Sequence, residues 1–238
     1  VLNFSIVLFC SSILGITFIF PVGQLLLWSS ENLTNNIPLG LLLNSFYIGF
    51  IVAFAASFIA LILSLGGFRN SNKAIFNLST IGYAVPGSVL AVALLLVFNF
   101  YFGISITILG IYGLFLCLLI RFITPLIRYL DAALLSMPEE TLSAAMIFSK
   151  NSFRTFKNIY FPSLYSPLLL GFLVVFIEVV KEQPATLLLR PVGFDTLSSK
   201  IYNFTSEGQW ELASTPSIAM IFLSLILVFI LNSRVDNE

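Results

Sequence analysis

The 238-residue sequence is 58% hydrophobic and only 9% charged, with 11 basic and 11 acidic residues in balance. Soluble domains carry about 25% charged residues, so this composition excludes a soluble globular protein and predicts one embedded in a membrane. The zero net charge argues against nucleic-acid binding. Because there is no histidine and the two cysteines, Cys10 and Cys117, are isolated in apolar runs, we expect no metal site and no catalytic site on this chain.

Charge-free apolar runs of about 18 or more residues predict membrane-spanning helices. We place six of them, at about residues 2–27, 41–65, 74–98, 104–120, 163–180 and 215–231. Pro21 and Gly23 predict a kink in the first, and the fourth is open to extension as far as Leu130. A break at residues 99–103 separates the third helix from the fourth. Two long polar segments remain, at residues 131–162 and 181–214.

Basic residues predict the orientation, because they are enriched in cytoplasmic loops. With the amino terminus inside, only Lys181, Arg190 and Lys200 fall in outer segments. This bias places segment 131–162 in the cytoplasm and segment 181–214 outside. The basic residues assigned to the cytoplasmic side are Arg69, Lys73, Arg121, Arg128, Lys150, Arg154, Lys157 and Arg234.

The third predicted helix contains the sequence IGYAVPG, which includes Tyr83, Pro86 and Gly87. A proline removes a backbone hydrogen bond, and membrane helices tolerate this only where neighbours or a cavity satisfy the backbone. Glycines permit close helix approach. One interpretation is a flexible kink beside a pore, and the other is ordinary helix packing.

The cytoplasmic segment contains two predicted short helices. Ser136 and Glu139 have the spacing of a capping box, with Pro138 in the first turn, and predict a helix from Met137 through Phe148. A second short helix is expected from Phe153 to Ile159. We expect Pro162 to end the segment just before the fifth span.

Ionisable residues gather where the fifth span meets the outer segment. Glu178, Lys181 and Glu182 lie there, followed by Pro184. Ionisable groups at membrane depth usually face the bundle interior or water and are functional candidates. Glu178 is therefore a candidate for an outer gate, although Glu178 and Lys181 at positions i and i+3 could simply pair at the interface.

The cytoplasmic segment resembles the EAA loop of binding-protein-dependent ABC importer permeases. The family pattern is E-A-A, three residues, G, nine residues and I-x-L-P, and this chain keeps every spacing. Three positions depart, with Ser143 in place of Glu, Ser149 in place of Gly and Phe161 in place of Leu. The resemblance implies a loop that docks on a separate ATPase. The alternative is an amphipathic hairpin without a partner. The candidate coupling residues are Ser143, Ala144, Ala145, Phe148, Ser149, Phe153 and Pro162.

A second resemblance is to ferric-iron permeases that work with periplasmic iron-binding proteins. Their pattern KELPATLLLRP-x-GFDTL is matched here from Lys181 to Leu197, with Gln183 as the departure. The resemblance covers about residues 24–231. Such permeases commonly hold two halves in one polypeptide, and this chain is similar to the second. Because it also begins with Val1 rather than Met, we expect a clipped sequence or part of a longer polypeptide.

These resemblances imply an all-α membrane protein with six transmembrane helices and the MetI-like fold of a type I ABC importer permease. They imply a first helix with its outer loop at residues 1–39 and a permease core at residues 40–238. The expected cargo is Fe(III). The expected location is the bacterial cytoplasmic (inner) membrane, with the amino terminus in the cytoplasm. The gate or translocation candidates are Tyr83, Pro86, Gly87, Glu178, Lys181, Glu182 and Pro184.

The chain lacks the GxxxxGK[ST] phosphate loop, so partner ATPase subunits are expected to bind ATP and Mg²⁺, and no cofactor is expected on this chain. The other expected partners are a second permease half or copy, a periplasmic substrate-binding protein and membrane lipid. An importer of the same class for thiamine, an aminophosphonate or a polyamine is the near alternative. An ion-coupled secondary transporter is the more distant one, because it would need coupling carboxylates near mid-membrane and the predicted spans contain none except the peripheral Glu178.

Overall fold

A computed structural model describes residues 4–31, 39–65, 81–103, 106–138, 140 and 152–235. Every regular element within these ranges is helical, which confirms the all-α class. The elements are α1 (Phe4–Leu14), η1 (Gly15–Ile19), α2 (Phe20–Glu31), α3 (Leu39–Leu65), η2 (Gly82–Ala84), α6 (Gly87–Phe102), α7 (Ile106–Leu135), α9 (Ser152–Thr155), η4 (Phe156–Tyr160), α10 (Phe161–Lys181), α11 (Pro184–Leu189), α12 (Leu197–Ser206) and α13 (Trp210–Val235).

Five helical stretches among the described residues are long and apolar enough to cross a membrane. They are Ile6–Glu31, Leu39–Leu65, Gly110–Leu135, Phe153–Lys181 and Trp210–Ile230. The third expected span, predicted at residues 74–98, corresponds among the described residues to the shorter apolar helix Gly87–Phe102, which is α6. Many large apolar side chains on these helices are exposed, as a lipid-facing surface requires.

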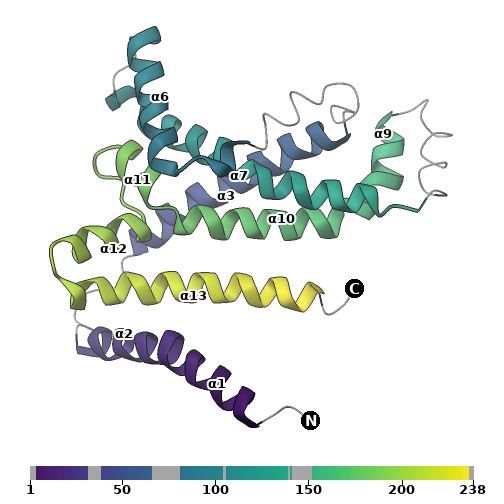
Figure 1. Cartoon of the computed structure of the whole chain (residues 1–238). Helices are drawn as coiled ribbons and strands as arrows, with labels where there is room; N and C mark the ends of the chain where they lie inside the picture. The colour runs from purple at the N-terminus through teal and green to yellow at the C-terminus, as the bar shows by residue number, and fades with distance from the viewer. Residues whose placement is uncertain are drawn as a thin grey trace.

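The core lies where α3, α7 and α10 pack together. Small residues on α3 allow this close packing, since Ala53, Ala56 and Ala60 are fully buried. The same core cluster contains large buried side chains such as Phe122 of α7 and Phe176 of α10. In Figure 1, α13 lies below α10, and α1–α2 form the next layer below α13.

The two ends of the bundle carry different elements. The short helices α11 and α12 lie at one end, which we call the α12 end, and α9 lies at the other, the α9 end (Figure 1). The start of α1 and the end of α13 also lie toward the α9 end. The orientation predicted from the basic residues would place the α12 end outside the cell. That assignment stays a prediction.

Several predicted boundaries are wrong. Helix α6 continues through the expected break at residues 99–103 until Gly103, whose φ of 61° ends it in the left-handed region. Helix α7 runs to Leu135, past the predicted end at residue 120 and past the extension to Leu130 that the sequence left open. The predicted outer segment 181–214 contains α11, α12 and the first residues of α13. Apolar runs predict the membrane-embedded part of a helix, whereas these helices extend into more polar sequence.

The fifth predicted helix begins earlier than expected. Elements α9, η4 and α10 follow one another from Ser152 to Lys181, so the predicted short helix 153–159 is helical but joins the span. The prediction that Pro162 ends the segment is therefore wrong. Pro162 has no N–H to donate, and the turn before it is a π-helix in which the Phe161 N–H donates to the Phe156 carbonyl, five residues back. This wider register lets the helix pass through the proline.

Candidate functional site

The predicted kink in the third helix is a break in the chain direction. The 3₁₀ turn η2 ends at Ala84, Val85 is extended with φ −82° and ψ 129°, and α6 begins at Gly87. A residue that precedes proline is disfavoured in the helical region, which explains the extended Val85 before Pro86. The break is confirmed. A role beside a pore stays a prediction.

Two glycines let this break approach its neighbours closely. A Cβ added to Gly82 would collide with the main-chain carbonyl of Ile120 on α7. A Cβ added to Gly87 would collide with Arg121 Nη1 and Glu182 Oε1. Both glycines are buried. The start of α6 therefore lies directly on the middle of α7 and on the corner between α10 and α11.

A buried ion pair lies at this contact. Arg121 Nη1 of α7 is 2.5 Å from Glu182 Oε1, and the side chains are 21% and 7% exposed, respectively. Glu182 follows the last residue of α10, where it occupies the C-cap position. The Arg121 guanidinium also lies 5.1 Å from the centre of the Phe122 ring.

The two residues of this ion pair differ in how many further hydrogen bonds they make. Glu182 Oε1 accepts a further hydrogen bond from the Ala185 N–H, at 3.3 Å. The Glu182 main-chain carbonyl accepts hydrogen bonds from the hydroxyls of Thr186 and Ser198, both at 2.9 Å. In contrast, Nε and Nη1 of Arg121 are buried and have no acceptor in hydrogen-bond geometry among the described residues. The contact with Glu182 is thus a close charge pair rather than an aligned hydrogen bond.

The structure brings three of the predicted gate residues to this junction. Gly87 and Glu182 touch across the ion pair. Tyr83, although 47% exposed, has its ring 6.3 Å from that of Phe122 in an edge arrangement. Both prolines are exposed, Pro86 as the N-cap residue of α6 and Pro184 as the first residue of α11. None of these positions tests a gating role, which stays a prediction.

Sequence reasoning missed Arg121. The assignment of Arg121 to a cytoplasmic segment is wrong, because it lies inside the span Gly110–Leu135 and pairs with a residue at the α12 end of α10. The available signal was a single arginine inside the apolar run that continues past Ile120. Without Arg121, the predicted cytoplasmic segments still contain more basic residues than the predicted outer segments.

Glu178 and Lys181 form the pair that the interfacial interpretation expects. Lys181 Nζ donates to Glu178 Oε1 at 2.9 Å, and the side chains are 46% and 34% exposed. A pair this exposed contributes little to stability. Within the predicted group of acidic residues, the deeply buried member is Glu182 rather than Glu178.

The segment from Arg190 to Ser199 is folded onto the start of α3. Arg190 pairs with Asp195, and the Thr196 side chain caps α12 in a reciprocal capping box with Ser199. The Leu197 N–H donates to the Ser45 hydroxyl at 2.8 Å, and the Asn44 side-chain amide donates to the Asp195 carbonyl at 2.9 Å. These contacts give the GFDTL sequence a structural role.

Most of the predicted coupling residues lie outside the described residues, namely Ser143, Ala144, Ala145, Phe148 and Ser149. Glu139 of the predicted capping box does too. The described members are Phe153, 74% exposed on α9, and the exposed Pro162. Both lie in the helical stretch that leads from α9 into α10, so a force applied at α9 would reach α10 directly.

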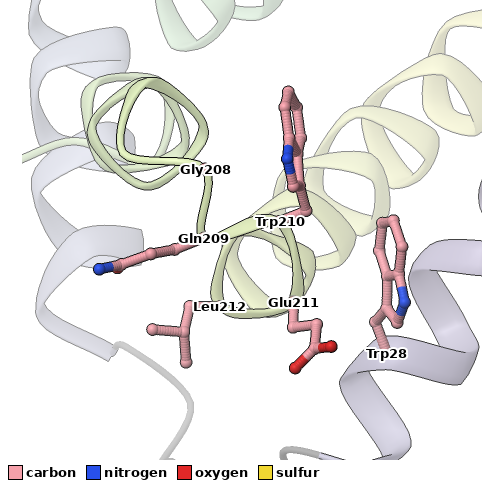
Figure 2. A pocket seen from close by; sticks show the side chains of 6 residues that line it. All are labelled: Trp28, Gly208, Gln209, Trp210, Glu211 and Leu212. Carbon is pink, nitrogen blue, oxygen red and sulfur yellow. The ribbon is translucent and has the colours of Figure 1, made fainter.

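A cavity of about 320 Å³ opens at the α12 end, away from the ion pair. Figure 2 shows its lining, which comes from the end of α2, the turn after α12 and the first residues of α13. The lining residues are Trp28, Gly208, Gln209, Trp210, Glu211 and Leu212. Sequence reasoning named none of them as a site residue. Tryptophans at span ends are typical of a membrane–water interface.

Comparison with known proteins gives matches in sequence and in structure. A model of the family described as "Binding-protein-dependent transport system inner membrane component" matches residues 56–237. The Fe(3+)-transport system permease protein FbpB 2 of Haemophilus influenzae is 28% identical over 153 residues, covering 63% of this chain and 29% of the relative. The ferric transport system permease protein FbpB of Actinobacillus pleuropneumoniae is 30% identical over 122 residues, covering 51% of this chain and 18% of the relative.

The chain therefore spans less than a third of the length of these relatives. Among solved structures, it is similar to "Inward facing conformations of the MetNI methionine ABC transporter: CY5 native crystal form". The TM-score is 0.60 at 16% identity, over 85% of this chain and 98% of that chain. At this identity the likeness shows the fold, and it agrees with the expected MetI-like arrangement.

Proposed function

Because this chain belongs to the family of inner membrane components of binding-protein-dependent transport systems, we propose that it forms one permease half of an ABC importer for Fe(III). The family match over residues 56–237 is the observation that carries the importer class. The ferric cargo has narrower support, from the printed names of two relatives and from the motif between Lys181 and Leu197.

The chain performs no chemistry in this proposal. A second permease half or copy completes the pathway, separate ATPase subunits bind ATP and Mg²⁺, and a periplasmic binding protein delivers the cargo. ATP binding then biases an equilibrium between conformations of the helices, which requires that the ATPase contact them differently in each state. The coupling residues 143–162 make that contact, and α9 passes it to α10.

Uptake by a reconstituted system tests the cargo. The complete polypeptide that contains this chain is placed in proteoliposomes with its ATPase, and its binding protein is supplied outside. We expect ATP-dependent accumulation of radioactive iron supplied as Fe(III) on the binding protein. Thiamine, an aminophosphonate and a polyamine serve as competing cargoes. Uptake of one of these without iron uptake would contradict the ferric assignment and leave the importer class intact.

Replacement of Ala144 and Ala145 by Asp tests the coupling residues. Two carboxylates on a closely packed docking surface would have to be desolvated without partners, which is costly. We expect the double variant to insert normally and to lose both transport and stimulation of ATP hydrolysis. Phe153→Ala, a substitution of an exposed side chain on α9, tests how far the contact with the ATPase extends along that helix. Normal transport by the double Asp variant would contradict the docking proposal.

A further inference from the structure

We propose that Arg121 and Glu182 form an ion-pair clasp that holds the α10–α11 corner on the start of α6 and opens during the transport cycle. The inference rests on the proposed function, because a clasp matters only in a chain that changes conformation. It assigns a positioning role to Arg121.

The pair joins three elements that are far apart in the sequence. Arg121 lies near the middle of the span Gly110–Leu135, and Glu182 ends α10 directly before α11. Gly87, the first residue of α6, packs on the charged atoms of both. The pair therefore adds a charged contact between α6, α7 and the α10–α11 corner, beside the apolar packing of α7 on α10.

For a buried ion pair, this one has few further hydrogen bonds to offset the loss of water around its charges. Removing two charges from water costs free energy that is recovered only when further hydrogen bonds satisfy them. The Glu182 carboxylate has such a bond from the Ala185 N–H, whereas Nε and Nη1 of Arg121 have no acceptor in hydrogen-bond geometry among the described residues. Separating an ion pair with fewer hydrogen bonds requires less free energy than separating one in which every polar group is bonded. Such a pair suits an element that alternates between two positions.

The backbone beside the pair provides a place to bend. Val85 and Pro86 are both outside helical geometry, between η2 and α6. Loop residues of this kind can absorb a change in φ and ψ when a helix swings. Because η2 is held against α7 by the contact of Gly82 with Ile120, rotation at Val85 and Pro86 would move α6 and carry Gly87 away from the clasp.

The other described ion pairs at this end differ from the clasp. Lys181 and Glu178 are one helical turn apart, and their side chains are partly exposed. Arg190 and Asp195 lie within one short segment, where Asp195 is also tied to Ser199. Neither pair joins two long helices. Arg190 with Asp195 therefore supplies a matched control, since its removal also deletes an ion pair near the α12 end.

A doubly neutral variant, which removes both charges, distinguishes an ion pair that opens during transport from one that only stabilises the fold. In Arg121→Met/Glu182→Met no buried charge is left without its partner, and such replacements are often neutral or stabilising. The variant, the control Arg190→Met/Asp195→Met and the wild type are assembled with the ATPase and binding protein in proteoliposomes. Thermal unfolding and ATP hydrolysis with and without loaded binding protein are measured on each.

We expect the doubly neutral variant to unfold at or above the wild-type temperature. We compare the ratio of the ATP hydrolysis rate without binding protein to the rate with loaded binding protein. In the doubly neutral variant we expect this ratio to be about fivefold or more above that of the wild type, which is the low end of typical coupling between sites. Arg121→Lys keeps the positive charge, so its hydrolysis ratio should lie between those of the doubly neutral variant and the wild type. The control should keep the wild-type ratio.

A folded doubly neutral variant with the wild-type ratio would overturn the clasp. Failure of that variant to fold would overturn it too, because the pair would then be a requirement of the fold. A wild-type assembly without any stimulation by the binding protein would instead overturn the proposed function, and the clasp with it.

Discussion

Gly82 packs directly against the main-chain carbonyl of Ile120, leaving no room for a side chain. The obstacle is backbone rather than a movable side chain, so Gly82→Ala must displace η2 or α7. We expect a loss of about 1–3 kcal/mol in the free energy of unfolding, as for other overpacked sites. Thermal or denaturant unfolding of the purified protein measures it.

Gly40→Ala is the matched control, because an added Cβ there meets nothing within 4 Å. Gly40 lies near the start of α3, where alanine is a better helix former than glycine. The control should be neutral or stabilising. Equal destabilisation by both substitutions would contradict the close contact at Gly82.

The Ser45 hydroxyl accepts a hydrogen bond from the Leu197 N–H across 152 positions of sequence. Both residues are fully buried, so Ser45→Ala leaves a buried N–H without an acceptor. We expect a loss of about 1–3 kcal/mol and faster hydrogen exchange of the Leu197 amide. Ser206→Ala removes a hydroxyl that bonds only within its own exposed turn, and it should change stability by less than about 0.5 kcal/mol.

Glu178 and Glu182, four residues apart, should respond differently to loss of the carboxylate. Glu178→Ala breaks an exposed pair and should cost less than about 1 kcal/mol. Glu182→Ala leaves the Arg121 guanidinium buried without its partner and should cost about 3–5 kcal/mol. Unfolding measurements compare the two. Transport by Glu178→Ala then tests the predicted gate role, and a wild-type rate would leave only the interfacial pair.

Trp28 and Trp210 are the two tryptophans of the chain, and both line the same cavity. Tryptophan fluorescence therefore reports on this one place. Both residues lie at the ends of spans, where the indole ring sits at headgroup level. We expect lipids brominated near the headgroup to quench the fluorescence more than lipids brominated at the end of the acyl chain. Single Trp→Phe variants assign the signal, and the opposite depth order would contradict the interfacial position.

Local patterns in the sequence predict what depends on neighbouring residues. Charge-free apolar runs predict membrane helices because a charged side chain is costly in lipid. Pro86 predicts a break because proline removes an N–H and restricts Val85, and the structure has that break. The helix ends were less predictable, because α7 continues past Ile120 through polar residues to Leu135, and its packing on α3 and α10 is not encoded in local hydropathy.

The sequence by itself determined a helical membrane protein, and its motifs pointed to the importer family. Only the tertiary structure decided that Arg121 belongs with Glu182 rather than with a cytoplasmic loop. It also decided that Ser45 holds the start of α12 and that Gly82 and Gly87 are contact points with α7. The physical reason is the same in each case. These interactions join residues distant in sequence, and hydropathy records the environment of one segment without recording which other segment satisfies its polar groups.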